Sequence, residues 1–405
     1  MSEILLITIS GEDHPGVTAG VTAILAQHRV NILDIGQAVI HATLSMGILI
    51  ELPAGVDREA VTAAMDAQAE AQGMRVKVSP VASVAYDEWI QAQGRARYII
   101  TLLARKITAD QLARVTEVVS RHNLNIDSIN RLSGRIPLGE LPALSKACVE
   151  FSVRGPLADS SAFRRDLLEV AGALDVDLAF QEDNMFRRNR RLVAFDMDST
   201  LIEAEVIDEL AVHAGMGDQV SEITERAMRG ELDFSESFRA RVALLEGLGE
   251  EALERIAGEL RITEGAEHLI STLHKLGYKT AILSGGFTYF ARYLQQRLGI
   301  DYVHANELDI ENGQVTGKVT GTIVDGERKA FLLRQLAEQE GLDLQQVIAV
   351  GDGANDLPML SAAGLGIAFR AKPLVKQSAE QSISTLGLDA ILYLLGFSDR
   401  YQSDH

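Results

Sequence analysis

The sequence predicts an α/β protein built from two small βαββαβ domains (ferredoxin-like, α+β) and a Rossmann-like parallel sheet with a helical cap insertion. Its 405 residues exceed one ordinary domain, for which about 150 residues is typical. The first half repeats one pattern, in which Asn31 of the first copy matches Asn125 of the second. After residue 191, apolar strands alternate with longer helices, as in an open parallel sheet. We therefore expect domains at 1–84, 95–182 and 190–405.

Each copy of the repeat begins with an apolar, β-branched strand followed by an amphipathic helix. These elements occupy 4–32 in the first copy and 98–126 in the second, and each copy then turns through its asparagine into a second strand. A third strand, a second helix and a last strand follow at 47–52, 58–71 and 74–80, and at 147–153, 161–173 and 176–182. The order βαββαβ predicts an antiparallel sheet with both helices on one face.

Two short segments connect the domains. We interpret residues 85–97 as a connector and residues 181–191 as a charged linker, whose four arginines lie within 187–191. A basic run is also a feature of nucleic-acid binding, but 57 acidic against 38 basic side chains give the chain a net charge of −19. A protein so acidic is repelled by nucleic acid and by anionic membranes. We therefore interpret the run as a solvated hinge.

The third domain starts with a buried strand in RLVAFDMDST at 191–200. Further strands in KTAILSGG at 279–286 and QQVIAVGDG at 345–353 end in glycine-rich turns. A long, mostly helical insertion at about 205–260 interrupts the alternation of strands and helices. Residues 308–324 alternate around an Asn-Gly pair and predict a β-hairpin.

The composition is that of a soluble globular protein, with 47% hydrophobic and 23% charged residues. The single cysteine, Cys148, excludes an intramolecular disulfide and a cysteine-ligated metal site. No run of about 18 apolar residues is present to span a bilayer, and the N-terminus lacks the basic region of a signal peptide. The expected compartment is the cytoplasm, with neither a membrane nor a nucleic acid as partner.

Two acidic clusters follow strands of the third domain. Asp196 and Asp198 lie in FDMDST, and Asp352 and Asp356 lie in GDGAND after another apolar strand. Ligands of open α/β sheets bind at the carboxyl ends of the strands, so the clusters are expected to meet there. A few hard oxygen ligands, completed by water or phosphate, suit Mg²⁺. A calcium loop is the alternative for GDGAND, but the segment lacks the further acidic residue and the helix pair of an EF-hand.

Two further features suit phosphoryl chemistry. SGGF at 284–287 lies between a strand and a helix, where the Ser284 hydroxyl and free N–H groups are placed to hold phosphate oxygens. Lys329 begins a later helix and supplies positive charge. Alone, Ser284 is more often a helix cap and Lys329 a surface lysine; the order DxDST, SGG, Lys, GDGxxD is specific. Neither GxxxxGK nor GxGxxG occurs, so no nucleotide-binding loop is predicted.

With these motifs in this order, residues 190–400 resemble the haloacid dehalogenase superfamily and, within it, the phosphoserine phosphatases. The resemblance implies that Asp196 is the nucleophile, which forms an aspartyl-phosphate, and that Asp198 is the general acid and base. It implies that Mg²⁺ is bound by Asp196, Asp352 and the main-chain carbonyl of Asp198.

The same resemblance assigns supporting roles around the phosphate. Ser284 and Lys329 offset the charge of the transferring group. Asp356 supports Lys329 or metal-bound water. Gly285 and Asn355 are implied contacts of the phosphate or of the cap side.

The insertion resembles the helical cap of the phosphoserine phosphatases. Glu205 stands at the family's spacing after Asp196, and Met228, Phe234 and Arg241 occupy the positions of the substrate pocket. The resemblance implies that Glu205 meets the substrate ammonium and Arg241 the carboxylate. An arginine fork also suits a carboxylate on chemical grounds, although taken alone Arg241 is more often an exposed helix residue, one of several arginines in this segment.

The first half resembles a tandem pair of ACT domains, which are small amino-acid-sensing modules. Ligand positions of that family lie after the first strand and before the second, here Asp13, Gly16 and Asn31, with Asn125 in the second copy. The second copy has Asp110 in place of Gly16, which argues against a ligand there because glycine lets a ligand approach the backbone. The resemblance implies L-serine as effector and a homodimer. The alternative is two structural domains that only dimerise.

The motifs and the resemblance together imply a Mg²⁺-dependent phosphoserine phosphatase, a phosphoric monoester hydrolase acting on O-phospho-L-serine. Such an enzyme completes L-serine biosynthesis, and L-serine is expected to regulate it through the ACT domains. Two alternatives stay open: a phosphatase of another small phosphomonoester or of phosphoproteins, and a serine-sensing protein with a vestigial phosphatase domain. A transport ATPase shares the aspartyl-phosphate chemistry but needs transmembrane segments, which this sequence lacks.

Overall fold

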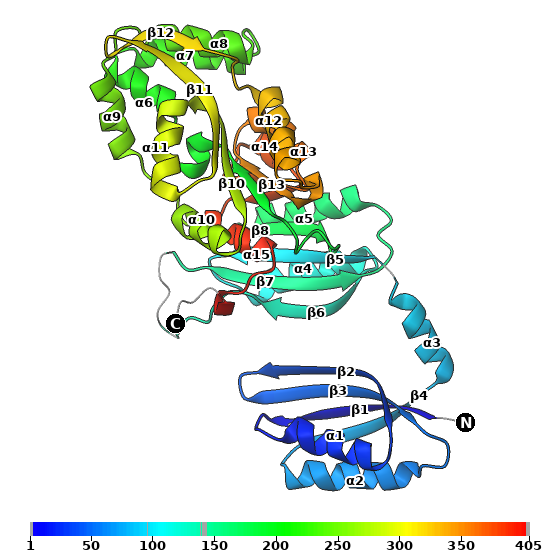
Figure 1. The fold of residues 1–405 in the computed structure, drawn as a ribbon. Helices are drawn as coiled ribbons and strands as arrows, with labels where there is room; N and C mark the ends of the chain where they lie inside the picture. Colours follow the sequence, from blue (N-terminus) through cyan, green and yellow to red (C-terminus); the bar gives the residue numbers. More distant parts are fainter. Residues whose placement is uncertain (1–2, 95, 138, 140–143, 402–405) are drawn as a thin grey trace. The chain divides into compact units, whose positions relative to one another are not determined.

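The computed structural model describes residues 3–94, 96–137, 139 and 144–401, and the chain divides into two compact units after residue 95. The predicted fold class is confirmed. Two antiparallel four-stranded sheets belong to the repeated half, and a seven-stranded, mostly parallel sheet follows (Figure 1). Among the described residues, no helix combines the length and the apolar character needed to cross a membrane.

The first unit is one βαββαβ domain followed by a helix. Its elements are β1 (Glu3–Glu12), α1 (Val17–Gln27), β2 (Asn31–Ile40), β3 (Thr43–Leu52), α2 (Arg58–Ala71), β4 (Arg75–Val81) and α3 (Ser83–Ala92). The sheet order is β2-β3-β1-β4, and all pairs are antiparallel. Leu5 and Ile7 of β1 share a core with Val17 and Val21 of α1. These alternating and helically spaced apolar residues are the ones that made the elements recognisable.

The second unit begins with the second βαββαβ domain. Its elements are β5 (Arg97–Ala104), α4 (Ala109–Arg121), β6 (Asn125–Arg131), β7 (Ala147–Arg154), α5 (Ser160–Leu174) and β8 (Asp177–Glu182), with sheet order β6-β7-β5-β8. Residues 99–104 of β5 are all buried. Ile100 and Leu102 pack in the domain's own core, whereas Leu103 and Cys148 join the core of the last domain. The sheet is therefore covered on both faces.

The last domain contains the seven-stranded sheet, in the order β12-β11-β10-β9-β13-β14-β15. Its strands are β9 (Leu192–Phe195), β10 (Lys279–Phe287), β11 (Tyr302–Glu311), β12 (Gln314–Thr320), β13 (Val347–Gly351), β14 (Leu365–Phe369) and β15 (Gln381–Ile383). Its helices outside the cap are α10 (Ala266–Lys275), α11 (Thr288–Leu298), α12 (Gly326–Gln339), α13 (Leu357–Ala362), α14 (Pro373–Ser378) and α15 (Ile391–Leu394). β11 and β12 form the expected antiparallel hairpin, with positive φ at Asn312 and Gly313.

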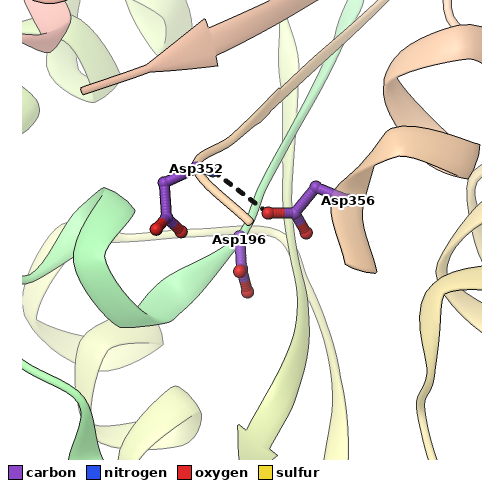
Figure 2. A group of neighbouring side chains, drawn as sticks. All are labelled: Asp196, Asp352 and Asp356. Carbon is purple, nitrogen blue, oxygen red and sulfur yellow. Dashed lines mark hydrogen bonds between the residues drawn. The ribbon is translucent and has the colours of Figure 1, made fainter. Parts of the chain in front are cut away.

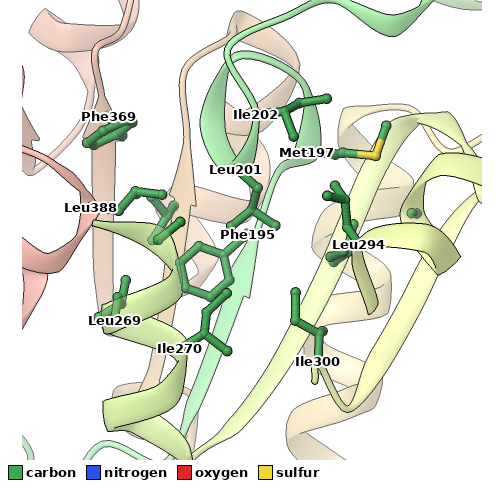
Figure 3. Close-up of a cluster of buried hydrophobic side chains, with 14 of the residues drawn as sticks. Phe195, Met197, Leu201, Ile202, Leu269, Ile270, Leu294, Ile300, Phe369 and Leu388 are labelled. Atoms are coloured by element: carbon green, nitrogen blue, oxygen red, sulfur yellow. The ribbon is translucent and has the colours of Figure 1, made fainter. Parts of the chain in front are cut away.

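Apolar side chains cover both faces of this sheet. Val193 and Phe195 of β9 belong to one cluster, which also contains Ile270 (Figure 3), and Leu192 and Ala194 belong to the other. Successive side chains of a strand point to opposite faces, so burial on both faces requires a continuous apolar run. The run ends at Asp196, which is thereby placed at the edge of the sheet.

Four helices form the insertion: α6 (Val206–His213), α7 (Gly217–Met228), α8 (Phe234–Ala243) and α9 (Glu250–Glu259). Two chain crossings, residues 201–205 and 260–264, join it to the sheet domain, and we call them the cap hinge. The crossings pair with each other: Ile202 and Ile262 form an antiparallel bridge, and the Glu203 N–H donates to the Arg261 carbonyl at 3.0 Å. Any movement of the cap relative to the sheet domain therefore has to bend or twist these two paired segments.

Polar contacts join the second βαββαβ domain to the last domain. The Asp177 carboxylate accepts from the backbone N–H groups of Ser384 and Thr385, at 2.8 and 2.7 Å. The Gln381 amide accepts from the Phe180 N–H at 2.8 Å and donates to the Phe180 carbonyl at 2.6 Å. Because an unpaired buried polar group costs about 1–3 kcal/mol, these contacts hold the two domains together.

The charged linker is not the solvated hinge that its composition predicts. Arg187 and Arg190 are only 1% and 5% exposed. Arg187 donates to Glu150 of β7 at 2.5 Å, and Arg190 donates to Gln181 at 3.2 Å. Burial lowers the pKa of Arg190 to about 10. The prediction was wrong because the carboxylate that pairs with Arg187 lies far away in the sequence.

Candidate active site

Two neighbouring strands bring the acidic residues together. β9 and β13 run parallel with Phe195 opposite Val350, so the residues that follow them lie at one edge of the sheet. Asp196, Asp352 and Asp356 each place a carboxylate oxygen within 4.8 Å of the others (Figure 2). The structure thus brings together the two acidic motifs.

Asp356 and Lys329 form a fully buried support beneath this cluster. Lys329 of α12 donates to Asp356 Oδ1 at 2.7 Å and lies 2.9 Å from Asp196 Oδ1. Asp356 Oδ2 accepts from the N–H groups of Asp352 and Gly353, at 3.1 and 2.9 Å. Both oxygens of Asp356 are therefore occupied. Asp196 Oδ2 and the Asp352 carboxylate are the oxygens left for a cation among the described residues of the cluster.

Buried negative charge exceeds positive charge here, because one ammonium faces three carboxylates. Burial and the charge of Asp356 raise the pKa of Asp196 to about 8, against the pull of Lys329. Burial and Asp356 also raise the pKa of Asp352 to about 7. For Lys329, burial lowers the pKa, but Asp196 and Asp356 outweigh burial and hold it above its usual value. Surplus charge and hard oxygen donors fit a divalent cation between Asp196 and Asp352.

Asp198 lies in η1 (Met197–Leu201), directly beyond the strand end. Its Oδ1 accepts from the Val206 N–H at 3.4 Å, and a Cβ added at Gly286 would lie 2.7 Å from its Oδ2. Burial, followed by the charges of Glu205 and Asp196, raises the pKa of Asp198 well above its usual value. A raised pKa suits a carboxyl group that donates a proton to a leaving oxygen.

The SGG segment lies inside β10 rather than after it, which corrects the expected strand end. The register between β10 and β11 shifts between Leu283 and Phe287, so residues 284–286 leave the regular ladder. The Gly286 N–H donates to Ser284 Oγ at 2.9 Å, and Ser284 is fully buried. The segment thus forms a bulge at the same sheet edge as the acidic cluster.

Gly285 is the point at which three parts of the site converge. A Cβ added there would lie 3.0 Å from Phe234 Cζ of the cap and 3.8 Å from Asn355 Nδ2. Asn355 belongs to η3 (Ala354–Asp356), within the second acidic motif. Any side chain at Gly285 would therefore press on the cap.

A buried asparagine that the sequence analysis missed supports this bulge. Asn306 of β11 is 2% exposed. Its amide donates to the Gly285 carbonyl at 2.8 Å, and its oxygen accepts from the Val324 N–H at 2.8 Å. No motif marks Asn306; the only signal is a polar residue within a strand.

Glu205 lies at the start of α6 and is oriented by a serine. Its Oε1 accepts from Ser199 Oγ at 2.8 Å. Ser199 has a φ of 56°, a left-handed conformation that is uncommon outside glycine. The charge of Glu205 contributes to the raised pKa values of Asp198 and Asp352, so Glu205 faces the same site. Sequence reasoning found Glu205 but missed Ser199, which lies within the DST motif.

Arg241 of α8 is half-buried among acidic groups. Burial lowers its pKa, and Asp208, Glu205 and Asp198 oppose that shift. The site therefore presents a cation and an anion, Arg241 and Glu205, near the phosphoryl-transfer cluster. These are the complements of the carboxylate and ammonium of an amino acid.

Two apolar residues complete the expected cap pocket. Phe234 stacks on Phe238, with ring centroids 6.0 Å apart and planes 5° from parallel. Met228 is the last residue of α7, and its side chain lies outside the described part of the chain. Phe234 therefore lies between Phe238 and the Gly285 segment.

A second candidate site lies in the first unit. A cavity of about 500 Å³ is lined by residues 13–19 together with Gln37 and Leu44. Gly16 has a φ of 100°, which glycine adopts without strain. Asn31 does not line this cavity; it donates to Glu51 Oε2 at 3.3 Å.

The corresponding loop of the second unit is built differently. Thr108 and Gln111 form a reciprocal capping box at the start of α4. Asn125 donates to Asp127 Oδ1 at 3.0 Å, and the same oxygen accepts from Arg154 at 3.1 Å. Asn125 is therefore engaged in contacts of its own domain.

All three parts of the chain match known families. Residues 3–79 and residues 96–181 each match an ACT domain, and residues 190–364 match the haloacid dehalogenase-like hydrolases. A HAD family hydrolase of Salmonella enterica serovar Typhi superposes with a TM-score of 0.64 at 30% identity, covering 73% of this chain and 98% of that one. A probable phosphoserine phosphatase of Vibrio cholerae gives 0.59 at 34% identity, over 75% and 88%.

Two curated relatives match over nearly the whole chain. A phosphoserine phosphatase of Streptomyces coelicolor is 41% identical over 395 residues, which are 97% of this chain and 92% of the relative. One of Mycobacterium tuberculosis is 40% identical over 392 residues, or 97% and 93%. The chain therefore belongs to the phosphoserine phosphatase family of the haloacid dehalogenase-like hydrolases, in a form with two ACT domains ahead of the hydrolase domain.

Proposed function

We propose that this protein hydrolyses O-phospho-L-serine to L-serine and phosphate, as the last step of L-serine biosynthesis. One observation carries the proposal: a phosphoryl-transfer cluster lies beside a cation and an anion suited to an amino acid. Asp196, Asp352 and Lys329 form the cluster, and Glu205 and Arg241 are the two charged groups. Similarity to phosphoserine phosphatases over nearly the whole chain supports the same substrate.

The first half of the reaction uses Asp196 and Asp198. The nucleophile is the ionised Asp196 carboxylate, whose charge Lys329 stabilises and a bound divalent cation would stabilise further. One of its oxygens attacks phosphorus in line with the serine oxygen. The bond from phosphorus to the serine oxygen breaks as the bond to Asp196 forms. Asp198, whose pKa is raised by burial and by the charges of Glu205 and Asp196, transfers its proton to the departing oxygen. The products are L-serine and phosphorylated Asp196.

The second half regenerates the site with water. Asp198, now ionised, removes a proton from a water molecule as the water oxygen attacks phosphorus. The bond between phosphorus and Asp196 breaks, and inorganic phosphate leaves. A closed cap excludes water during the first half, so that the phosphoryl group passes to Asp196 rather than directly to water.

Charge around the phosphate carries much of the acceleration in this chemistry. Lys329, 2.9 Å from Asp196, offsets the charge of the transferring group. Ser284 and the N–H of Gly285 hold phosphate oxygens, and Asn355 contacts the phosphate or cap side of the substrate. Asn306 keeps the Gly285 peptide in place.

Mg²⁺ is the proposed metal. Asp196, Asp352 and the main-chain carbonyl of Asp198 hold it, and Asp356 supports Lys329 instead of binding it. When bound, Mg²⁺ supplies positive charge beside the phosphate oxygens.

The cap selects the amino acid. Glu205 pairs with the ammonium of phosphoserine, and Arg241 pairs with the carboxylate. Phe234 lines the same pocket, and the family implies Met228 as a further pocket position. A phosphomonoester without these two charges gains nothing from the cap, which distinguishes the proposal from a general phosphatase.

For regulation, we propose that L-serine binds the first ACT domain at the cavity formed by Asp13 and Gly16 and changes activity or assembly. The family also implies Asn31 and Asn125 as ligand positions, but Asn31 lies outside this cavity and Asn125 hydrogen-bonds within its own domain. We also propose a homodimer and the domain boundaries 1–84, 95–182 and 190–405, with the cap at about 205–260.

The test is phosphate release from O-phospho-L-serine, with and without Mg²⁺, for the wild type and Asp196→Asn. We expect Mg²⁺-dependent release that the substitution abolishes. Release from an aryl phosphate but not from phosphoserine would support the phosphatase mechanism but contradict the recognition of an amino acid by the cap. Release from neither substrate would favour a serine-sensing protein with a vestigial phosphatase domain.

A further inference from the structure

One arginine of the second ACT domain reaches the cap hinge. Arg105 follows β5, and its guanidinium donates to both oxygens of Glu264, at 2.8 and 2.9 Å. Glu264 is the last residue of the hinge, directly before Gly265, the N-cap of α10. The two side chains are 29% and 20% exposed, so the pair is largely shielded from water. A bidentate pair of this kind fixes orientation as well as distance.

Arg105 is itself held firmly by its own domain. Ser145 Oγ donates to the Arg105 carbonyl at 2.9 Å, and Arg105 Nη1 donates back to the Ser145 carbonyl at 3.4 Å. The domain in turn is tied to the hydrolase sheet through Asp177, Gln381 and a shared apolar core. Arg105 therefore connects the body formed by the second ACT domain and the hydrolase sheet to the cap hinge.

The same carboxylate also reaches the other crossing of the hinge. Arg370, which follows β14, donates to Glu264 Oε2 at 2.8 Å and lies 3.6 Å from Glu203 Oε1. Glu203 belongs to the first crossing. Arg105, Glu264, Arg370 and Glu203 thus form a chain of alternating charges, which we call the hinge network.

Backbone conformation supports a functional role for this network. Arg370 has a φ of 45°, in the left-handed region that non-glycine residues rarely adopt. Such strain persists only where the surroundings impose it, and it clusters at functional sites. Glu203 also lies two positions before Glu205, the proposed ligand of the substrate ammonium. The network therefore ends next to a substrate-binding residue.

We propose that Arg105 is a positioning residue of the phosphatase reaction: through Glu264 it holds the cap hinge, so that the second ACT domain sets the balance between the open and the closed cap. The inference rests on the proposed function in that phosphoserine is the substrate that closes the cap. It gives the second ACT domain a role that needs no ligand of its own. This agrees with the capping box that occupies its ligand loop.

The test uses Arg105→Gln in the full-length chain, with kcat and KM measured on O-phospho-L-serine and on an aryl phosphate. We expect KM for phosphoserine to rise about fivefold, the lower end of typical coupling between sites. The parameters for the aryl phosphate should change less than about twofold, because that substrate does not use Glu205 and Arg241. Glu264→Gln should raise KM for phosphoserine by a similar factor. Because both substitutions break the same ion pair, the double variant should raise KM no more than either single variant does.

The matched control is Arg297→Gln. Arg297 of α11 forms an exposed ion pair with Glu267 of α10 at 3.3 Å. Glu267 lies three residues after Glu264, but neither member of this pair belongs to the hinge network. Its removal should leave both substrates unaffected. Arg105→Lys keeps the charge but loses the fork, and should raise KM for phosphoserine less than Arg105→Gln does; it also serves as the test if Arg105→Gln does not fold.

These measurements distinguish failure of the Arg105 inference from failure of the proposed phosphatase function. A folded Arg105→Gln variant with wild-type KM for phosphoserine overturns this inference alone, as does an equal loss on both substrates. If only Arg105→Lys folds, wild-type KM values in it and in Glu264→Gln overturn the inference. A wild type that is inactive on phosphoserine overturns the proposed function and, with it, this inference.

Discussion

The orientation of Glu205 depends on a single hydroxyl, that of Ser199. We expect Ser199→Ala to raise KM for phosphoserine about tenfold, because a hydrogen bond to a charged group contributes about 1.5 kcal/mol. The kcat should stay within about twofold, since Ser199 does not touch the reacting atoms in the proposed mechanism. Steady-state kinetics on phosphoserine and an aryl phosphate measure both effects.

Ser199→Gly is the control for backbone strain, since glycine adopts the positive φ of this position freely. Both variants lack the hydroxyl, so both should raise KM. If Ser199→Gly keeps a wild-type KM while Ser199→Ala does not, the backbone matters and the hydroxyl does not.

Arg241 tests whether the cap recognises a carboxylate. We expect Arg241→Ala to lower kcat/KM for phosphoserine about 100-fold, because truncating one member of a shielded charge pair typically costs about 2–5 kcal/mol. For an aryl phosphate the loss should be below about threefold. Arg239→Ala, on the exposed side of the same helix, is the matched control and should change neither value. Equal losses on the two substrates would remove Arg241 from the recognition of the carboxylate.

Residues that carry motifs were predictable from the sequence, and residues that support them were not. Asp196 and Asp352 follow apolar strands, and parallel strands end at one edge of a sheet, so their meeting was predicted from the pattern alone. Ser199 and Asn306 each act through one or two hydrogen bonds to segments that are distant or irregular. Single polar residues are common in strands and turns, so nothing along the chain distinguishes these two from the rest.

At the scale of elements, the bulge at 284–286 depends on its neighbour β11. Asn306 links that strand to the bulge through the Gly285 carbonyl, and its oxygen also accepts from the Val324 N–H outside the bulge. We expect Asn306→Ala to lower the free energy of unfolding by about 1–3 kcal/mol, because it leaves buried polar groups unpaired. It should also lower kcat, because the Gly285 peptide is no longer held.

Denaturant unfolding and single-substrate kinetics together check this prediction. Asn306→Asp is the paired variant: it keeps the acceptor for the Val324 N–H but sets a buried oxygen against the Gly285 carbonyl, so it should lower kcat and stability at least as much as Asn306→Ala. A variant Asn306→Ala with normal kcat and reduced stability would limit Asn306 to a structural role.

Element positions followed from periodicity wherever one face of an element is buried. The helix at 58–71 and the strand at 147–153 appear within a residue of the expected bounds. Periodicity did not predict the bulge of β10 after Leu283, because a bulge is defined by the pairing with a partner strand. The apolar run predicted β5 as a buried strand, but it does not reveal that one face of the strand contacts another domain.

For the whole molecule, the two ACT domains should behave differently on truncation. The chain divides into compact units after residue 95, so a protein that starts at residue 96 should fold and retain phosphatase activity. If L-serine acts through the cavity at Gly16, this protein should keep only the inhibition by L-serine that is competitive with phosphoserine. Calorimetric titration of L-serine, in parallel with activity, measures both properties.

A protein that starts at residue 184 lacks the second ACT domain and should be unstable or aggregate. It leaves the Gln381 side chain without Phe180 and uncovers apolar surface that Leu103 and Cys148 cover. A thermal midpoint equal to that of the protein starting at residue 96 would contradict the view that the second ACT domain is part of the catalytic body.

Whole-molecule organisation was the least predictable level. The repeat and the alternation of strands and helices were sufficient to predict the fold class. The burial of Arg187 was missed, because its partner Glu150 belongs to another domain and charge patterns along the chain carry no information about such pairs. Packing between domains is decided by surfaces that come together only in the folded chain.

The most direct test of the central claim is acid-quenched capture of the phosphorylated enzyme. The protein is mixed with O-phospho-L-serine labelled on phosphorus, stopped within milliseconds and digested. The account predicts label on the peptide that contains Asp196, stable in acid and released by base or hydroxylamine, and no label in Asp196→Asn. Label that persists in Asp196→Asn, or phosphate release by the wild type without any labelled protein during turnover, would contradict it.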